Sequence, residues 1–421
     1  MNSNAAILPG VSLAAPHASY PERNTAYWRR NLAVCVFGSF TTLVSLSMLL
    51  PFLPVYVREL GAVSRADIIQ WSAIAFGATF FGTALTSPIW GHVADRVGRK
   101  LMLVRAAVGM ATVMSLIGVA HSVHQLVALR LIAGLVGGYF AAATILIGTQ
   151  TPSERAGWAL GILSTGALAG NLLGPLIGGF LPGLLGIRGT FFAGGALIAI
   201  AAILTIFLVR EDFDPATDAR RPVGHHDAAA PTDFAVVAVL LTTATMVLLA
   251  NMSIEPIITV YIGQLGVGSE QLIRVSGVVM AGSALGSILT ASRLGALADR
   301  IGGWKVIIGC LLATAVTMIP QAFVTQWWQL ALLRVLMGMT LAGLLPAITK
   351  LARHAVPEHH TGRMLGFLQS AQFAGQVLGP LLGGQVGIRL GLSSVFFMTA
   401  VILGACAGLV LWAQARSGVV R

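Results

Sequence analysis

Twelve long apolar segments occupy most of this 421-residue chain, and each is long enough to cross a lipid bilayer. A membrane-spanning helix needs about 20 apolar residues. Only 10% of the residues are charged, whereas soluble domains carry about 25%. The segments lie at residues 31–57, 70–90, 101–120, 125–149, 158–182, 190–209, 234–262, 271–293, 305–324, 329–350, 363–386 and 394–413. We therefore predict an all-α membrane protein with twelve transmembrane helices, one for each segment.

A polar stretch at residues 210–233 separates the first six apolar segments from the last six. It is rich in acidic, basic and proline residues, and it is too short to fold as a domain. The predicted organisation is a cytoplasmic tail at 1–30, a six-helix bundle at 31–209, a cytoplasmic linker at 210–233, a second six-helix bundle at 234–413 and a cytoplasmic tail at 414–421.

The arginine and lysine residues are distributed unevenly over the predicted loops. If both termini are cytoplasmic, the outer side carries only five cations: Arg58, Arg65, Arg188, Arg274 and Arg389. This positive-inside pattern predicts cytoplasmic N- and C-termini. It also accounts for the net charge of +11. Because the cations do not form one cluster, we predict no nucleic-acid partner.

The two halves of the chain share landmarks that recur 204 or 205 residues apart. The paired landmarks are Pro51–Tyr56 with Pro256–Tyr261, Arg130 with Arg334, and Gly174-Pro175 with Gly379-Pro380. A drift of one residue in the spacing is what a small difference in loop length would cause. The repeat predicts two pseudo-symmetric bundles.

A charged segment, Gly91-His92-Val93-Ala94-Asp95-Arg96-Val97-Gly98-Arg99-Lys100, separates two of the apolar segments. A shorter copy, Gly295-Ala296-Leu297-Ala298-Asp299-Arg300-Ile301-Gly302, follows 204 residues later. We predict that both are tight cytoplasmic loops between helices. The positive-inside rule explains the cations but not Asp95, since a carboxylate adds nothing to that bias.

The first copy closely resembles the loop between helices 2 and 3 of the major facilitator superfamily of transporters. That family has two parallel six-helix halves, and its loop is implicated in closing the cytoplasmic gate. The resemblance implies gating roles for Gly91, Asp95, Arg96, Gly98, Arg99 and Lys100. It also implies that Asp95 lies near Thr361-Gly362, at the N-terminus of the eleventh predicted helix, where the helix dipole favours an anion. In the second copy, Asp299 and Arg300 are the candidates for the same role.

Arg130 lies in the fourth apolar segment together with Gly134, Gly137 and Gly138. Spacings of four and seven residues place this group on one helical face, where small residues let another helix approach. Resemblance to the family's helix 4 motif implies that Arg130 takes part in proton coupling. An alternative is that Arg130 snorkels to the membrane surface, about 8 Å away along a helix. Arg334 has the same geometry in the second half.

The fifth segment carries Gly166, Gly170, Gly174 and Gly178 at intervals of four, with Pro175 beside them. Such a ridge predicts close helix packing, and Pro175 predicts a bend. The pattern resembles the helix 5 motif of drug:proton antiporters, which implies export. Gly375, Gly379, Pro380, Gly383 and Gly384 repeat it in the second half.

Glu255 is the one carboxylate within an apolar segment rather than at a segment edge, in a loop or in a tail. A carboxylate inside a membrane can exchange protons and attract cations when it is ionised. An alternative is that the helix ends early and Glu255 caps it in the outer headgroup region. Asn251, one turn earlier, is a further candidate for the cavity.

Gln369, Gln372 and Gln376 share one face of the eleventh predicted helix. Ser164, Ala167 and Asn171 occupy the corresponding positions of the first half, and Asn171 is a further candidate for the cavity. This asymmetry favours a substrate site, although amides can also join helices.

The leading hypothesis is a proton-coupled multidrug efflux transporter of the bacterial inner membrane that works by alternating access. It would be a monomer that handles a small-molecule substrate and protons within the lipid bilayer, driven by the proton gradient without a cofactor or metal. One alternative is a sugar or metabolite carrier of the same fold, which would need more polar residues in its cavity. Another is a polytopic membrane enzyme or sensor, but the sequence has no nucleophile elbow, HExxH pair or phosphate-binding loop.

Overall fold

The computed structural model describes residues 27–211, 234–357 and 360–416, and in this part the chain is helical. The first half contains α1 (Trp28–Ser47), α2 (Leu53–Glu59), α3 (Arg65–Val97), α4 (Arg99–Gly118), α5 (Val123–Val136), α6 (Tyr139–Gln150), α7 (Ser153–Phe180) and α8 (Pro182–Leu208). The second half contains α10 (Phe234–Ile254), α11 (Ile258–Gln264), α12 (Ser269–Ile301), α13 (Gly303–Gln321), α14 (Trp327–Leu341), α15 (Leu344–His354), α16 (Thr361–Leu390) and α17 (Leu392–Arg416).

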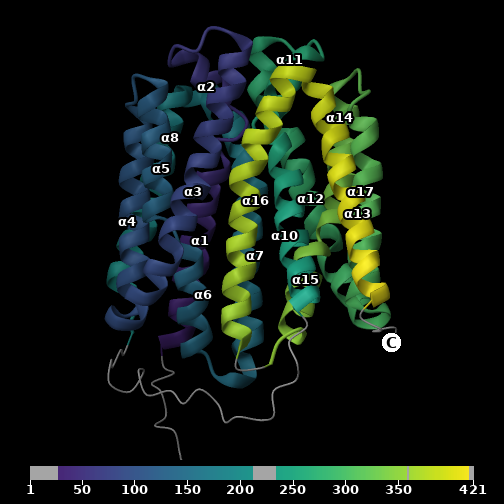
Figure 1. Ribbon diagram of the computed structural model, residues 1–421. Helices are drawn as coiled ribbons and strands as arrows, with labels where there is room; N and C mark the ends of the chain where they lie inside the picture. Colours follow the sequence, from purple (N-terminus) through teal and green to yellow (C-terminus); the bar gives the residue numbers. More distant parts are fainter. Residues whose placement is uncertain (1–26, 212–233, 358–359, 417–421) are drawn as a thin grey trace, which may run out of the picture.

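The long helices run side by side along a common direction (Figure 1). Among the described residues, 11 helical stretches are long and apolar enough to cross a membrane. The remaining predicted segment, 363–386, forms the 30-residue α16. Its glutamines and glycines make it less apolar than the others, but it runs the length of the bundle beside α10 (Figure 1). The predicted all-α membrane fold is confirmed.

Four of the predicted transmembrane helices are interrupted, so the expectation of one helix per segment is wrong for these four. Two interruptions contain a proline, Pro51 between α1 and α2 and Pro256 between α10 and α11, and proline cannot donate a backbone hydrogen bond. The other two lie at Gly137-Gly138 and at Ala342-Gly343. Gly138 has a φ of +104°, which suits glycine best. The four breaks occur at matching positions in the two halves.

The two charged segments are not loops, which corrects the prediction. Gly91–Val97 is the end of α3, Gly98 alone makes the turn, and α4 starts at Arg99. The second copy is built in the same way, with φ values of +92° at Gly98 and +93° at Gly302. A helix of 33 residues is about 50 Å long, so α3 extends well past a hydrocarbon core of about 30 Å. Loss of hydropathy therefore marks the membrane surface and not the end of the helix.

Each half encloses its own hydrophobic core, and the two halves meet along two pairs of helices. α7 packs against α12, and α3 packs against α16. A Cβ added to Gly277 of α12 would lie 2.4 Å from the carbonyl oxygen of Pro175, and one added to Gly384 of α16 would lie 3.0 Å from the Cβ of Ala73. The Thr259 hydroxyl also donates to the Pro51 carbonyl across the halves at 3.0 Å.

These contacts lie toward the end of the molecule that carries α2 and α11, at the top of Figure 1. Toward the other end the same four helices separate. A Cβ added to Gly91 of α3, Gly161 of α7, Gly295 of α12 or Gly366 of α16 would have no atom within 4 Å. The two bundles are therefore closed at the predicted outer end and open at the predicted cytoplasmic end.

The start of the predicted linker is attached to the first bundle. The backbone N–H of Arg210 donates to the Asn31 side chain at 3.1 Å, and the Arg210 carbonyl accepts from Asn31 and Gln150. The rest of the predicted linker, and most of both predicted tails, lie outside the described residues.

Candidate functional site

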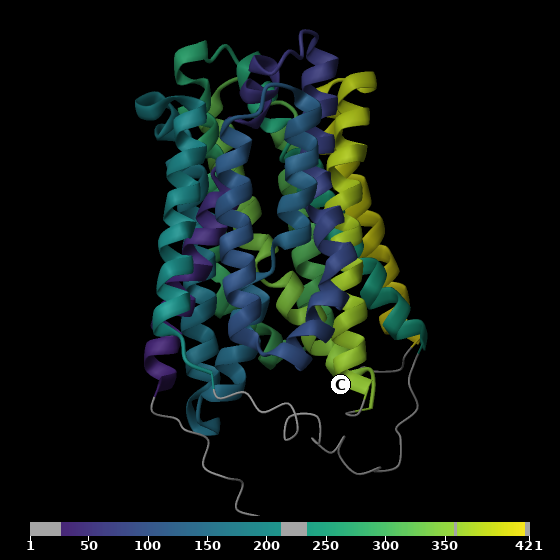
Figure 2. The same ribbon diagram turned by 90° about the vertical axis from the view of Figure 1, so that its left-hand side faces the viewer.

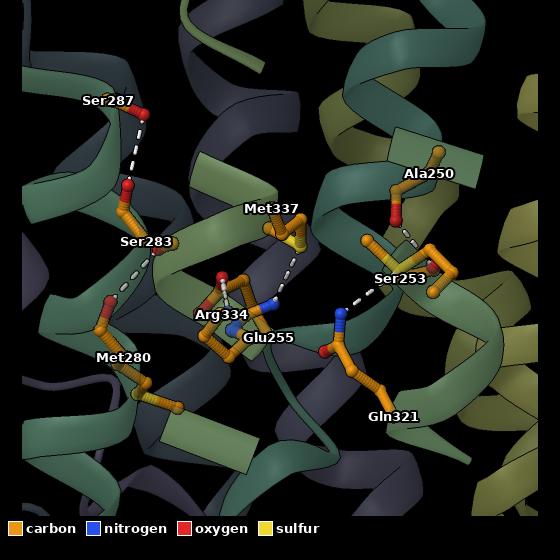
Figure 3. Close-up of polar contacts among 10 residues, drawn as sticks. Ala250, Ser253, Glu255, Met280, Ser283, Ser287, Gln321, Arg334 and Met337 are labelled. Carbon is orange, nitrogen blue, oxygen red and sulfur yellow. Dashed lines mark hydrogen bonds and ion pairs between the residues drawn. The ribbon is translucent and has the colours of Figure 1, made fainter. Parts of the chain in front are cut away.

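A buried ion pair joins the break between α10 and α11 to the middle of helix α14. Arg334 of α14 donates from Nη2 to Oε1 of Glu255 at 2.7 Å, and the two side chains are 0% and 9% exposed (Figure 3). Pro256 ends α10 at Ile254, as the capping alternative for Glu255 requires. The carboxylate nevertheless turns into the protein and binds Arg334. The second guanidinium contact is a weak one, from Nη1 to the Met337 sulfur at 3.7 Å.

Arg130 occupies the matching position in the first bundle but has a different environment. Its side chain is only 1% exposed, and its Nε donates to the Ala75 carbonyl at 3.2 Å. The guanidinium lies 5.9 Å from the ring centre of Phe76, and Nη1 is buried without a hydrogen-bond partner in the described part of the chain. The residue that corresponds to Glu255, 205 positions earlier, is Leu50. Arg130 points into the protein, which contradicts the snorkelling alternative.

The glycines that follow Arg130 have two different roles. Gly134 allows α5 to approach α3, because a Cβ there would lie 2.0 Å from the Thr79 carbonyl oxygen. The sequence predicted that Gly137 and Gly138 continue the same helical face. They instead form the break before α6. The carbonyl of Gly137 is freed by that break and accepts from Nη2 of Arg105 at 2.9 Å.

Arg105 is a functional candidate that the sequence analysis missed. Its guanidinium stacks 3.6 Å from the ring centre of Trp90, and the Trp90 indole donates to the Leu135 carbonyl at 2.7 Å. Arg105 lies six residues after Arg99, the first residue of α4, and within the predicted apolar segment 101–120. Because charged residues inside transmembrane segments are rare, Arg105 could have been identified from the sequence.

A central cavity of about 530 Å³ lies within the first bundle and is closed on one side by α16. Gln369, Phe373 and Gln376 of α16 line it, and the two glutamines are among the cavity candidates of the sequence analysis. Its other walls come from α1, α3, α4, α5 and α6, and Arg105 is the one charged side chain among the described residues that line it. Gln372, Asn171 and Asn251 are not among its lining residues, and neither are Arg130, Arg334 and Glu255.

The turn between α3 and α4 is bound by an acidic residue that the sequence analysis did not single out. The carboxylate of Glu211 accepts from the backbone N–H groups of Arg99 and Lys100 at 3.0 and 2.6 Å. An anion there stabilises the N-terminus of α4. At the second turn Asp299 instead pairs with Lys350 of α15, while Arg300 is exposed. The Asp95 side chain lies outside the described residues, so its contact with the start of α16 stays a prediction.

The glycine ridges lie against neighbouring helices of the same bundle, as their spacing predicts. On α7, a Cβ at Gly170, Gly174 or Gly178 would lie within 2.8 Å of an atom of α1 or of the turn that follows it. On α16, a Cβ at Gly379 would lie 2.6 Å from the Leu249 carbonyl oxygen of α10. Pro175 and Pro380 are both inside continuous helices.

Comparison with known proteins agrees with this architecture. A family model described as Major Facilitator Superfamily matches residues 35–291 and 240–419. The chain is 40% identical over 376 residues to the multidrug resistance protein MdtG of Salmonella paratyphi C, which covers 89% of this chain and 93% of the relative. It is 39% identical over 383 residues to the MdtG of Proteus mirabilis, covering 91% of this chain and 95% of the relative.

Two solved structures share the fold at low sequence identity. A bacterial homologue of the human lysosomal transporter Spinster, in an inward-facing and occupied conformation, has a TM-score of 0.75 at 17% identity and covers 92% of this chain and 97% of that one. The human organic anion transporter MFSD10 has a TM-score of 0.66 at 18% identity, covering 91% of this chain and 99% of that one. On the strength of the family match and the identity to MdtG, the chain belongs to the major facilitator superfamily, a family of membrane transporters.

Proposed function

We propose that the chain is a proton-coupled exporter of lipophilic or amphipathic compounds in the bacterial inner membrane. The observation that carries the proposal is the 40% identity, over 89% of the chain, to a multidrug resistance protein. The largely apolar cavity and the glycine ridge with Pro175 agree with it. The transporter works as a monomer by alternating access, and its energy comes from the proton gradient without a cofactor.

Glu255 is the proposed proton carrier. A buried carboxylate paired with one arginine must lose that ion pair when it is protonated, because a neutral carboxyl no longer attracts the guanidinium. The pair connects the α10–α11 break with α14. Proton binding therefore changes the contacts between these elements, and a change of this kind can bias the equilibrium between two conformations.

The cavity indicates the charge of the preferred substrate. No carboxylate is among its described lining residues, and Arg105 is its one charged group. A cationic wall in a space of low dielectric disfavours cations. The substrates are therefore lipophilic compounds that are neutral or carry an acidic group, and Gln369 and Gln376 supply hydrogen bonds to them.

Closure of the cytoplasmic end is the proposed role of the α3–α4 turn. In the other conformation Asp95 meets the N-terminus of α16, which begins at Thr361. The backbone N–H groups of Arg99 and Lys100 donate to the Glu211 carboxylate, which stabilises the turn.

Transport by everted membrane vesicles tests the proposal. Vesicles with the wild-type protein should accumulate a fluorescent lipophilic compound when a pH gradient is imposed, and accumulation should stop when the gradient is collapsed. Glu255→Gln should abolish gradient-driven accumulation and retain exchange of substrate across the membrane. Glu270→Gln, which alters an exposed carboxylate in the first turn of α12, is the matched control and should behave as wild type. Accumulation that survives collapse of the pH gradient would refute proton coupling.

A further inference from the structure

A second hollow, separate from the central cavity, lies between the first turns of α1 and α7. Its volume is about 870 Å³, and its charged and aromatic lining residues are Trp28, Arg29, Arg155 and Trp158. Its apolar lining residues are Leu32, Ala33, Val36 and Ile162. None of these residues lines the central cavity. We call this hollow the α1–α7 groove.

The groove forms because two helices that are in close contact further along separate at this end. A Cβ at Gly166 of α7 would lie 2.8 Å from Val36 of α1, so the helices nearly touch there. Two turns earlier, the exposed Trp158 meets Trp28 edge to face at 6.4 Å between ring centres. The two indoles therefore form an aromatic wall of the groove.

The groove opens toward lipid and not toward the central cavity. Trp158, Ile162, Leu173 and Phe180 are exposed apolar residues on one face of α7, as their spacing requires. Asn171 and Ser164 lie on a different face and correspond to Gln376 and Gln369, which do line the central cavity. Large exposed apolar side chains on a transmembrane helix face the acyl chains of the bilayer.

The two cations of the groove have no carboxylate partner in the described part of the chain. Arg29 and Arg155 are exposed, and the guanidinium of Arg29 lies 5.4 Å from the ring centre of Trp28. Glu154 is next to Arg155 in the sequence but forms no ion pair with either arginine. Both cations lie at the predicted cytoplasmic end, where the start of α1 appears at the bottom of Figure 2.

We propose that the α1–α7 groove binds an anionic phospholipid of the inner leaflet. Its phosphate lies between Arg29 and Arg155, the indoles of Trp28 and Trp158 lie at headgroup level, and an acyl chain runs along Val36 and Ile162. Basic side chains beside apolar surface at a membrane interface match the chemistry of such a lipid, which combines a phosphate with hydrocarbon. This assignment is independent of the proposed transport activity.

Lipid binding to the purified, delipidated full-length protein tests the proposal, with bound lipid counted by native mass spectrometry. Dioleoyl phosphatidylglycerol should bind in a saturable way, and dioleoyl phosphatidylcholine, which has the same chains and no net charge, should bind much more weakly. Each basic residue near an anionic lipid surface contributes about a fivefold factor, so Arg29→Gln/Arg155→Gln should weaken phosphatidylglycerol binding about 25-fold. Arg293→Gln/Arg353→Gln removes two exposed arginines elsewhere at the same end and should leave the affinity unchanged.

Equal binding of the two lipids would overturn the assignment, and so would unchanged affinity of the Arg29→Gln/Arg155→Gln variant. Displacement of the lipid by excess inorganic phosphate would also overturn it, because the groove would then be a site for small anions. Quenching of tryptophan fluorescence by bromine-labelled phosphatidylglycerol locates the lipid without altering the arginines. The quenching should fall in Trp158→Phe and not in Trp328→Phe, which removes an exposed indole at the opposite end. The reverse pattern would place the lipid elsewhere and refute the proposal.

Discussion

Arg130 and Arg334 hold matching places in the two bundles, yet of these two only Arg334 pairs with a carboxylate in the described part of the chain. Arg334 binds Glu255 at 2.7 Å, whereas Arg130 relies on the Ala75 carbonyl and the ring of Phe76. The difference arises at one position of the repeat, which is Glu255 in the second half and Leu50 in the first. Both halves kept the proline, the helix break and the arginine, so the backbone is shared while the titratable group is not. The second bundle therefore carries a titratable carboxylate at this place, and the first bundle carries an apolar side chain.

The largest effect is expected when the carboxylate loses its partner. Arg334→Leu leaves Glu255 buried and unpaired, and breaking a buried ion pair in this way costs about 3–5 kcal/mol. The free energy of unfolding in mixed detergents should fall by that amount. Arg334→Leu/Glu255→Leu removes both charges and should recover most of the stability without recovering transport. If the double variant has the same low unfolding free energy as Arg334→Leu, the packing of the two side chains, and not their charge, stabilises the fold.

The glycine ridges test a feature in which the two halves agree. A Cβ at Gly178 would lie 1.8 Å from the Met48 carbonyl oxygen, and one at Gly383 would lie 2.0 Å from that of Ser253. Gly178→Ala and Gly383→Ala should each cost about 1–3 kcal/mol of unfolding free energy, because the helices must separate.

Gly161→Ala is the control for these ridge variants, since a Cβ there meets no atom within 4 Å. It should be neutral or stabilising by about 0.5–1 kcal/mol. A large effect at only one of the two ridge positions would show that the two bundles do not pack equivalently.

Leu50→Glu introduces the missing carboxylate into the first bundle. If the halves superpose as the repeat implies, the new side chain comes within reach of Arg130. A double-mutant cycle of Leu50→Glu with Arg130→Leu should then give a favourable coupling of about 1–2 kcal/mol in unfolding free energy. No coupling would mean that the two bundles differ in geometry around the break as well as in sequence.

The smallest effect is expected for the ion pair of the second turn. Lys350 and Asp299 form a pair whose side chains are 49% and 67% exposed. Exposed pairs contribute about 0–1 kcal/mol, so Lys350→Ala should change the thermal midpoint little. Export rates measured in the vesicle assay should also stay close to wild type. A strong loss of export with unchanged stability would instead show that the second turn takes part in gating.

The sequence alone was sufficient for the membrane-spanning helical fold, the duplication and the two helices that carry glycine ridges. Hydropathy and glycine spacing are local properties, and a bilayer requires an apolar stretch of about 20 residues in each spanning helix, whatever its neighbours. The sequence also singled out Arg130, Arg334 and Glu255, because charged residues inside apolar segments are rare. It did not reveal that the charged segment after residue 90 continues α3, since a helix can extend beyond the membrane without any change in its backbone pattern.

Tertiary structure decided which of these groups meet. Glu255 and Arg334 are 79 residues apart, and no local pattern joins them, whereas the helix break at Pro256 turns the carboxylate toward α14. Arg105 and Glu211 also find their partners only in the folded protein. Arg105 donates to the Gly137 carbonyl, which the break before α6 leaves unpaired, and Glu211 accepts from the backbone N–H of Arg99 at the N-terminus of α4. Composition and periodicity predict which segments cross the membrane, because the surface of each spanning helix must match the hydrocarbon around it. Pairing of buried charges depends on how separate helices pack, so it is settled only when the bundles form.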